Sequence, residues 1–524
     1  MRIGVLDSVI GGRDDLDAFE RARGIGCAGV EVMLLGRHLR GMEKPKALRA
    51  AQAATGLEIP SFVLDEHNFG GIAAPDPQVA AAAAEEVRIA VAWAQKLGVG
   101  VILIPFFVEA ELRDDAAFER AAAAFRELCP LAEASGVVLA YEGTLPAAGV
   151  RALAERVASP AFGCYFDVAN LVVRGLDPPT EIRSLGDLIR RVHVKDLRAR
   201  KNDSRPGLGR VDFPECVAAL EEIGYDGWLV LETPAAPPPV VARDVTFTAT
   251  TFGADVPARP VFGAFSDELS DWDGLAETFT TLGLGAVQLA GPLLDRCLAD
   301  AAYTFEGRTL LEERGIRVAA LSGYRNLVAP SADLDHVKRC LEVAPALGTW
   351  VVATGTGTRS TQSDWADHPD NWSKESWQLL EEAIDALLPT AEANGTVLAL
   401  EGTWMTVLRT LSQLLDLLER RPSPNLQVVC DPYNFVSYEL LPAQDRFLSE
   451  YLERFESRFV LAHLKDVGVD GKRTTRPEFG TGVFHHGPYL EFLRTHRPDL
   501  PLVLEHLPLE HVPDAIGRVG VYAA

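Results

Sequence analysis

The chain has 524 residues, 48% of them hydrophobic and 24% charged, which is typical of a globular protein too long for a single core. Its formal net charge of −24 repels phosphate backbones and argues against nucleic acid as a partner. No apolar run approaches the roughly 18 residues of a membrane span, and the seven cysteines are isolated. Neither a membrane association nor a disulfide scaffold is therefore expected, and the cytoplasm is the predicted location.

Short apolar runs alternate with helix-like stretches through the first half of the chain. The helical stretches include 78–96 and 116–135, which glycines at 98 and 136 close. Eight strands that alternate with helices over roughly 235 residues predict a parallel (β/α)₈ TIM barrel. The predicted strands are 3–6, 30–34, 59–64, 101–104, 137–141, 162–166, 191–193 and 228–231.

A proline-rich stretch at 234–239 interrupts this pattern, because it cannot continue a helix or a central strand. Residues 1–234 are predicted as the first barrel, 235–260 as a linker and 261–524 as a second barrel. A repeat of about 260 residues indicates domain duplication, since solenoid repeats are far shorter. The strands predicted in the second half are 261–265, 286–289, 318–321, 350–353, 397–400, 426–430, 459–462 and 502–504.

The motif His193-Val-Lys-Asp196 recurs as His463-Leu-Lys-Asp466, in each half at the end of the seventh predicted strand. Acidic residues recur in the same order at the ends of strands five, six and eight, where the active sites of such barrels lie. Two glutamates, an aspartate and an imidazole suit Mn²⁺, Mg²⁺ or Co²⁺, with Zn²⁺ also possible. The predicted ligand sets are Glu142, Asp167, His193 and Glu232, and Glu401, Asp431, His463 and Glu505.

Any one of these acids, taken alone, has the alternative interpretation of a charged residue at the start of a loop. The recurrence of the whole set favours one metal site in each half, since a buried carboxylate needs a partner. Their neighbouring sequences also carry a family pattern. In the first half it covers 139–142, 166–170, 192–196, 207–213, 224–228 and 230–232, and in the second 398–401, 429–434, 463–466, 480–482 and 503–505.

On these motifs both halves resemble the sugar phosphate isomerase/epimerase superfamily, the xylose-isomerase-like barrels. The resemblance implies that each ligand set binds one divalent ion. It also implies that the glutamates of strands five and eight move a substrate proton on opposite faces of an enediolate. These catalytic candidates are Glu142 and Glu232 in the first half and Glu401 and Glu505 in the second.

A divalent ion that chelates a carbonyl and its neighbouring hydroxyl stabilises enolate charge, so a nearby carboxylate can remove the α-proton. Reprotonation then decides between epimerisation and isomerisation, and loss of a β-hydroxyl gives dehydration. We predict an isomerase or epimerase of a sugar or related polyhydroxy ketone. The alternatives are an inosose dehydratase-like lyase that acts on a keto-sugar or cyclitol, and a sugar-binding barrel pair without turnover.

Two departures from the family narrow the substrate. Similar ketohexose epimerases carry a further glutamate in the loop after strand five, whereas 143–150 and 402–408 contain none, so a free ketohexose is disfavoured. The additional histidines of endonuclease IV are not matched either, which disfavours DNA repair.

Six residues near the predicted ligands are candidates for substrate binding, although each lysine has the equal alternative of a salt bridge to a metal-binding carboxylate. The loop after the seventh predicted strand is rich in basic residues, which indicates a site for an anionic substrate group. The alternative is that these side chains are solvated at the surface. The residues are Arg198, Arg200, Lys201, Arg205 and Arg210. The two barrels are expected to pack as an intrachain pseudo-dimer. The six candidates are His67, Asn170, Lys195, Arg198, Asn434 and Lys465.

The second predicted strands end differently in the two halves, with Glu31 in one and Gln288 in the other. A carboxylate in one copy and an amide in the other indicate different substrates or unequal activity. Drift at a structural position is an equal alternative.

Overall fold

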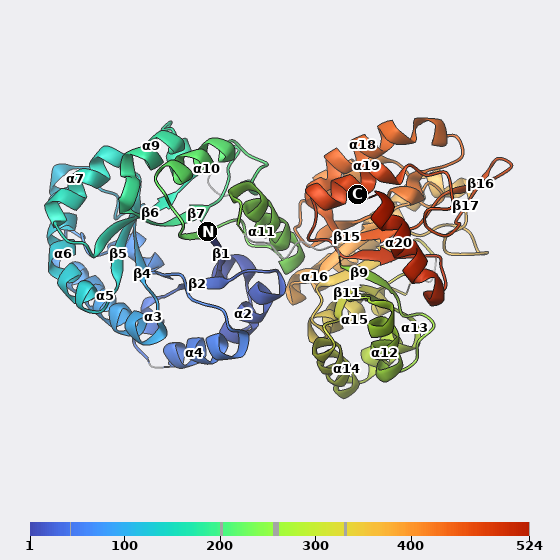
Figure 1. Ribbon diagram of the computed structural model, residues 1–524, viewed down its shortest axis with the longest axis horizontal. Coiled ribbons are helices and arrows are strands. Elements are labelled where there is room, and N and C mark those ends of the chain that lie inside the picture. Colours follow the sequence, from blue (N-terminus) through green and yellow to red (C-terminus); the bar gives the residue numbers. More distant parts are fainter. Residues whose placement is uncertain (42, 200–202, 255–260, 330–332, 523–524) are drawn as a thin grey trace. The chain divides into compact units, whose positions relative to one another are not determined.

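Sixteen parallel strands form two closed barrels of eight in the computed structural model of the chain (Figure 1). The structure describes all residues except 42, 200–202, 255–260, 330–332 and 523–524, and only the backbone of 521–522. The chain divides into two compact units, Met1–Pro257 and Ala258–Ala524, with one barrel in each. The predicted pair of (β/α)₈ barrels is therefore confirmed.

In the first unit the strands follow chain order around the barrel, which closes where β1 pairs with β8. The strands read as near-continuous apolar runs because helices cover their outer face and side chains fill the interior. The strands are β1 (Arg2–Leu6), β2 (Gly29–Met33), β3 (Phe62–Val63), β4 (Val101–Phe106), β5 (Val138–Gly143), β6 (Phe162–Asp167), β7 (Ile189–Val194) and β8 (Trp228–Leu231).

Helices form the outer ring of this barrel (Figure 1). The predicted helices 78–96 and 116–135 are α5 and α6, and Gly98 ends α5 with the positive φ of 75° that favours glycine. The helices are α1 (Asp7–Ile10), α2 (Asp15–Gly24), α3 (Gly36–Leu39), α4 (Glu43–Thr55), α5 (Pro77–Leu97), α6 (Asp115–Ala134), α7 (Ala147–Val157), α8 (Asn170–Val173), α9 (Pro178–Leu185) and α10 (Phe213–Glu222).

The stretch predicted as a linker, 235–260, contains a helix, α11 (Pro238–Phe252). Pro238 lies in its first turn, where the missing N–H of proline has no partner to lose, so the proline run begins a helix here. Val241 and Val245 of α11 are part of the buried core of the first barrel. This part of the predicted linker therefore belongs to the first unit, and 255–260 lie outside the described residues.

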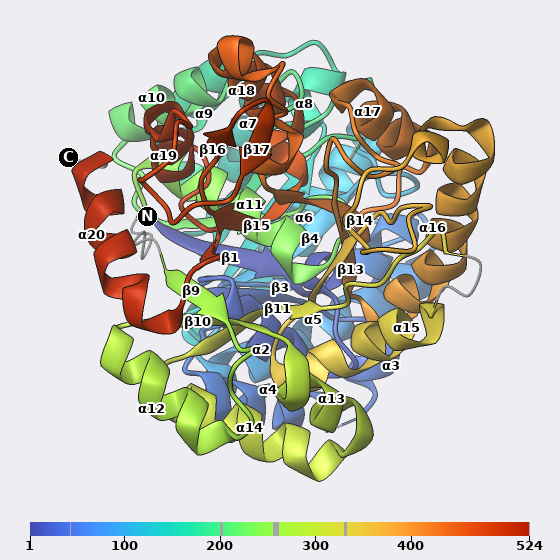
Figure 2. The same cartoon turned by 90° about the vertical axis from the view of Figure 1, so that its right-hand side faces the viewer.

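The second barrel (Figure 2) repeats this order. It closes where β18 pairs with β9. A short antiparallel hairpin, β16 (Gly468–Asp470) with β17 (Arg473–Thr475), interrupts the loop that follows β15. The barrel strands are β9 (Phe262–Phe265), β10 (Ala286–Leu289), β11 (Arg317–Ser322), β12 (Val351–Gly355), β13 (Val397–Glu401), β14 (Leu426–Cys430), β15 (Phe459–Leu464) and β18 (Leu502–Leu504).

The outer ring of the second barrel is again helical (Figure 2). Among the described residues of the whole chain, no helix has the length and apolar character to cross a membrane. The helices of this unit are α12 (Trp272–Leu282), α13 (Gly291–Ala299), α14 (Ala301–Glu313), α15 (Leu334–Val343), α16 (Lys374–Asn394), α17 (Leu411–Arg420), α18 (Gln444–Phe455), α19 (His486–Thr495) and α20 (Val512–Tyr522).

Candidate metal centres

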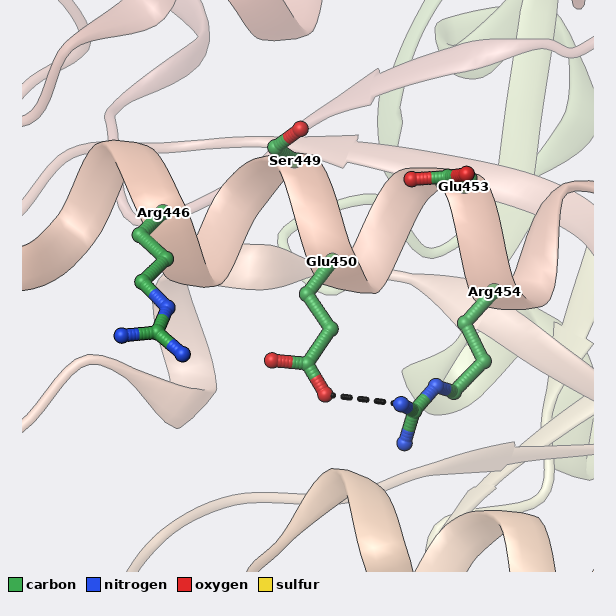
Figure 3. Close-up of a pocket in the computed structure, with 5 residues that line it drawn as sticks. All are labelled: Arg446, Ser449, Glu450, Glu453 and Arg454. Carbon is green, nitrogen blue, oxygen red and sulfur yellow. Dashed lines mark ion pairs between the residues drawn. The ribbon is translucent and has the colours of Figure 1, made fainter.

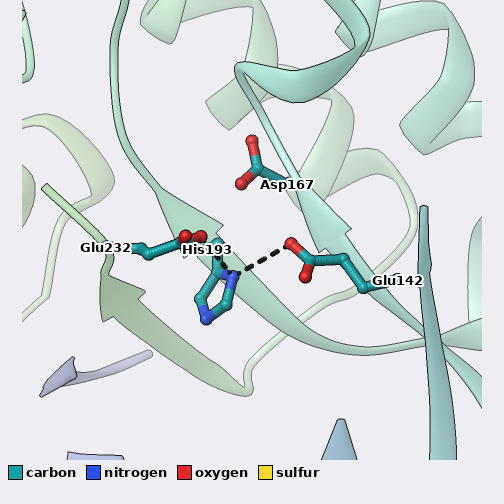
Figure 4. Close-up of side chains that lie close together, drawn as sticks. All are labelled: Glu142, Asp167, His193 and Glu232. Atoms are coloured by element: carbon teal, nitrogen blue, oxygen red, sulfur yellow. Dashed lines mark hydrogen bonds and ion pairs between the residues drawn. The ribbon is translucent and has the colours of Figure 1, made fainter. Parts of the chain in front are cut away.

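Four side chains from neighbouring strands meet at the carboxyl end of the first barrel (Figure 4). Glu142 lies near the end of β5, Asp167 ends β6, His193 lies near the end of β7, and Glu232 directly follows β8. One ligand atom of each lies within 4.8 Å of those of the others. Parallel strands that end at the same rim bring these distant positions together, and the structure thus assembles the first predicted ligand set.

The two nitrogens of the buried His193 ring face different partners. Nδ1 lies 3.2 Å from Glu142 Oε1 and 2.9 Å from Glu232 Oε2, whereas Nε2 lies 2.8 Å from Glu31 Oε2. The other oxygen of Glu31 accepts hydrogen bonds from Tyr165 and Ser61. An N–H at Nε2 that donates to Glu31 directs Nδ1, once deprotonated, at the carboxylate cluster.

The second barrel repeats this arrangement with Glu401, Asp431, His463 and Glu505, whose ligand atoms also lie within 4.8 Å of one another. His463 Nδ1 lies 3.3 Å from Asp431, 3.4 Å from Glu505 and 3.5 Å from Glu401. Its Nε2 lies 2.9 Å from Gln288 Oε1, which accepts the N–H as Glu31 does in the first barrel. Carboxylate and amide therefore perform the same orienting task.

Each cluster contains a buried lysine from the His-x-Lys-Asp motif. Lys195 Nζ lies 2.6 Å from Asp167 and 2.8 Å from Glu232. Lys465 Nζ lies 2.6 Å from Asp431 and 2.5 Å from Glu505. The lysines thus make the salt bridges that the sequence offered as their alternative role, and each neutralises one of three clustered acids.

Burial and the remaining negative charge together shift several pKa values in the clusters. Burial raises the pKa of Glu142 above its ordinary value and that of Glu401 to about 7. Burial alone lowers the pKa of His463, but the charges of Glu505, Glu401 and Asp431 outweigh it and raise that pKa to about 8. Crowded carboxylates favour an additional positive charge, either a proton or a metal ion.

Both clusters fit a divalent ion. Ligands bound at about 2.0–2.2 Å lie at most about 4.4 Å from one another, close to the 4.8 Å spread of the donor atoms. Three carboxylates and one imidazole nitrogen form the hard donor set that such ions prefer, and the acids outnumber the single lysine. The residues that would hold the ion are the eight predicted ligands.

Two further predicted residues, Asn170 and Asn434, lie in the clusters. The side-chain amide of Asn170 donates to Glu142 over 3.4 Å, and that of Asn434 donates to Glu401 and, over 3.0 Å, to Asp431. Their contacts orient the carboxylates of β5 and β13, and in the second barrel also that of Asp431, which follows β14.

Two other residues predicted to bind substrate, His67 and Arg198, make their contacts away from the first cluster. His67 is buried, with Nε2 3.1 Å from Glu86 of α5. Arg198 is exposed and donates to the carbonyl of Leu208 in its own loop. Arg200 and Lys201 of the predicted arginine cluster lie outside the described residues.

The aspartate of each His-x-Lys-Asp motif organises the loop after the seventh strand, a role that sequence reasoning missed. The Asp196 carboxylate accepts backbone N–H bonds from Gly207, Gly209, Arg210 and Val211. Asp466 accepts those of Val467, Gly482 and Phe484. The repeated Asp, followed in each half by a glycine-rich loop, was the available signal.

A hollow of about 650 Å³ lies elsewhere, on the exposed face of α18 in the outer ring of the second barrel (Figure 3). Its lining includes an ordinary i, i+4 ion pair of 3.0 Å between Glu450 and Arg454. No member of either cluster lines it. We therefore assign no chemistry to it.

The fold and the two clusters define a pair of TIM barrels, each with a cluster of three acids and a histidine at its carboxyl-terminal mouth that could hold a metal ion. The family described as a xylose isomerase-like TIM barrel matches the chain at residues 19–250 and 280–517. The chain belongs to this family, as its sequence motifs predicted.

Relatives with named activities match parts of the chain. A 2-epi-5-epi-valiolone 7-phosphate 2-epimerase from Actinoplanes sp. (strain ATCC 31044 / CBS 674.73 / SE50/110) is 43% identical over 106 residues, which are 20% of this chain and 38% of that protein. The L-ribulose-5-phosphate 3-epimerase UlaE of Salmonella paratyphi C (strain RKS4594) is 32% identical over 198 residues, 36% of this chain and 69% of that protein. A solved D-psicose 3-epimerase matches 48% of this chain and 100% of its own, at 15% identity and a TM-score of 0.43.

Replacing Glu31 or Gln288 with leucine is expected to weaken metal binding to the corresponding barrel about 10- to 100-fold, because the histidine loses the acceptor that orients it. Glu31→Gln is the matched control, since the amide oxygen still accepts the Nε2 N–H, as Gln288 does. Calorimetric metal titration of the full chain measures both sites. Wild-type affinity in both leucine variants, with an unchanged melting temperature, would contradict this role.

Proposed function

We propose that the chain is a divalent-metal-dependent isomerase or epimerase of a sugar or related polyhydroxy ketone, with one ion and one reaction centre in each barrel. The single observation that carries the proposal is the placement of two glutamates, from the fifth and eighth strands, beside the same histidine nitrogen in each cluster. The two relatives named above, both epimerases of phosphorylated substrates, support the same reaction class.

When bound, the ion would supply positive charge that stabilises the negative charge developing on a substrate oxygen. We propose Mn²⁺, Mg²⁺ or Co²⁺ for this role, with Zn²⁺ possible as well. The asparagines Asn170 and Asn434 would hold the carboxylate of the fifth strand in place. The lysines would neutralise part of the negative charge of each cluster through their salt bridges to the aspartate and the second glutamate.

The glutamates would carry the proton. Glu142 and Glu232 lie on different sides of His193 (Figure 4), so a substrate carbon between them would present one face to each. One glutamate removes the α-proton, and the other returns a proton to the opposite face, which inverts that carbon. The raised pKa of Glu142, caused first by burial, favours proton uptake by this carboxylate. Glu401 and Glu505 would act in the same way in the second barrel.

Deuterium wash-in tests the proposal. We expect the chain, loaded with Mn²⁺, Mg²⁺ or Co²⁺ in turn, to introduce deuterium next to the carbonyl of at least one member of a panel of ketoses, inososes and sugar acids. Products are read by NMR and mass spectrometry after the metal has been chelated. Appearance of a dehydrated product would favour the lyase. Tight sugar binding in calorimetry without isotope exchange would favour the barrel pair that binds sugar without turnover.

A further inference from the structure

The loops that follow the seventh strands place corresponding arginines at the two barrel mouths. Each loop is held by the aspartate of the His-x-Lys-Asp motif and then carries a short matching sequence. In the first barrel this sequence is Ser204-Arg205-Pro206-Gly207, and in the second it is Thr475-Arg476-Pro477-Glu478. Arg205 and Arg476 therefore occupy equivalent positions.

Arg205 is fully engaged by its own barrel. One of its guanidinium nitrogens pairs with the buried carboxylate of Asp244 in α11, and the other donates to the carbonyl of Pro234 over 2.8 Å. Asp244 is also within 3.4 Å of Arg243. The positive charge of Arg205 is therefore neutralised by α11 and is not available to a ligand at the mouth.

Arg476 has no such partner. Its guanidinium donates to two carbonyl groups, those of Thr475 at 3.3 Å and Tyr433 at 3.4 Å. Within the described residues Arg476 makes no ion pair, and the nearby carboxylates of the cluster pair with Lys465 instead. Burial lowers the pKa of Arg476, while Asp431, Glu505 and Glu401 raise it, so the guanidinium lies within electrostatic range of three candidate metal ligands.

A histidine joins Arg476 at this mouth. His506 follows Glu505 directly and adopts a positive φ of 56°, an unfavourable conformation for a residue other than glycine that concentrates at functional sites. Its Nε2 lies 3.9 Å from Glu505, about half of its side chain is exposed, and Arg476 is among the charges that lower its pKa, after burial. In the first barrel the equivalent residue after Glu232 is a buried threonine, Thr233.

The two clusters also differ in net charge, and the second is the less negative. Around His193, four carboxylates, including Glu31, face one lysine. Around His463, Gln288 takes the place of Glu31, so three carboxylates face one lysine. A divalent ion would leave one net negative charge in the first cluster and none in the second, and Arg476 would then make the second mouth positive.

We infer that the second barrel binds a substrate with an anionic oxygen group, a phosphate or a carboxylate, that pairs with Arg476, whereas the first barrel takes an uncharged substrate. The inference rests on the proposed function for its substrate class, but the anion site itself is a property of Arg476 and its surroundings. Two N–H groups of an arginine match two oxygens of a phosphate or carboxylate.

Calorimetric titration of the full, Mg²⁺-loaded chain with inorganic phosphate, and separately with acetate, tests the inference. We expect one equivalent of phosphate or acetate per chain, and Arg476→Gln should weaken that binding about 10- to 100-fold. Arg205→Gln, the matched control in the other barrel, should leave it unchanged. The probe that binds more tightly identifies phosphate or carboxylate as the preferred group.

Three outcomes overturn the inference: no binding of either anion by the wild-type chain at millimolar concentration, two equal equivalents per chain, or anion binding that survives Arg476→Gln. The last would indicate an anion held by the metal ion alone. Melting temperatures and metal content verify that both variants are folded and loaded. Binding needs no turnover, so an absence of deuterium exchange would refute the proposed function and leave this test intact.

Discussion

A chain in which Glu232 is replaced by glutamine is expected to exchange a substrate proton without inverting the carbon. Glutamine keeps the shape and a ligand oxygen of glutamate but cannot accept a proton. Glu142, on the other side of His193, would still remove and return a proton on its own face (Figure 4). Epimerisation in the first barrel should fall by about 10²–10⁴-fold, the usual contribution of a general acid or base.

The experiment needs the second barrel silenced, so each variant is made together with Glu401→Gln and Glu505→Gln. NMR in deuterated water then reports isotope incorporation and the ratio of epimers separately. Glu142→Gln is the complementary variant, in which Glu232 alone should exchange the proton, on the opposite face of the carbon. Removal of both glutamates should abolish both signals. Epimerisation that persists in Glu232→Gln at the wild-type rate, with metal content unchanged, would exclude a two-base mechanism.

The sequence predicts the barrels well because the signals that define them are local. Each strand is a short apolar run, and each run is followed by a helix with an identifiable start or end, such as Asp76 at the N-cap of α5 and Gly98 after its last residue. The strand predicted at 426–430 coincides with β14, and the helix predicted at 78–96 lies within α5. Topology then places Glu142 and Glu232 together, although 90 residues separate them.

What the sequence does not predict depends on contacts between distant residues. Glu31 and Gln288 are visible as a difference between the halves, but their shared partner, the Nε2 atom of a histidine more than 160 residues away, is not. The same holds for Arg205 and Arg476, because only the structure shows that Asp244 neutralises the first. The sequence raised the arginines of the first barrel as an anion site, with solvated surface arginines as the alternative, and it did not single out Arg476.

The pH dependence of metal binding follows from the clusters as well. In the ion-free second cluster, carboxylate charge outweighs burial and raises the pKa of His463 to about 8, so the ring is protonated at lower pH. An ion that binds Nδ1 must displace that proton. Metal binding to this site should therefore release a proton below about pH 8 and weaken as the pH falls further.

Metal stoichiometry gives the other large expected effect, with two divalent ions per wild-type chain and one in either His193→Ala or His463→Ala. Each histidine supplies the only nitrogen in its ligand set, and its loss leaves clustered acids that repel one another. His67→Ala and His336→Ala are matched controls, because both remove a buried histidine that makes its contacts outside the clusters. Elemental analysis after extensive dialysis should find two ions in each control. If His463→Ala retained the wild-type metal content while His193→Ala lost all of it, the second cluster would be an ion-free network held by Lys465, and the proposal of one ion in each barrel would be wrong.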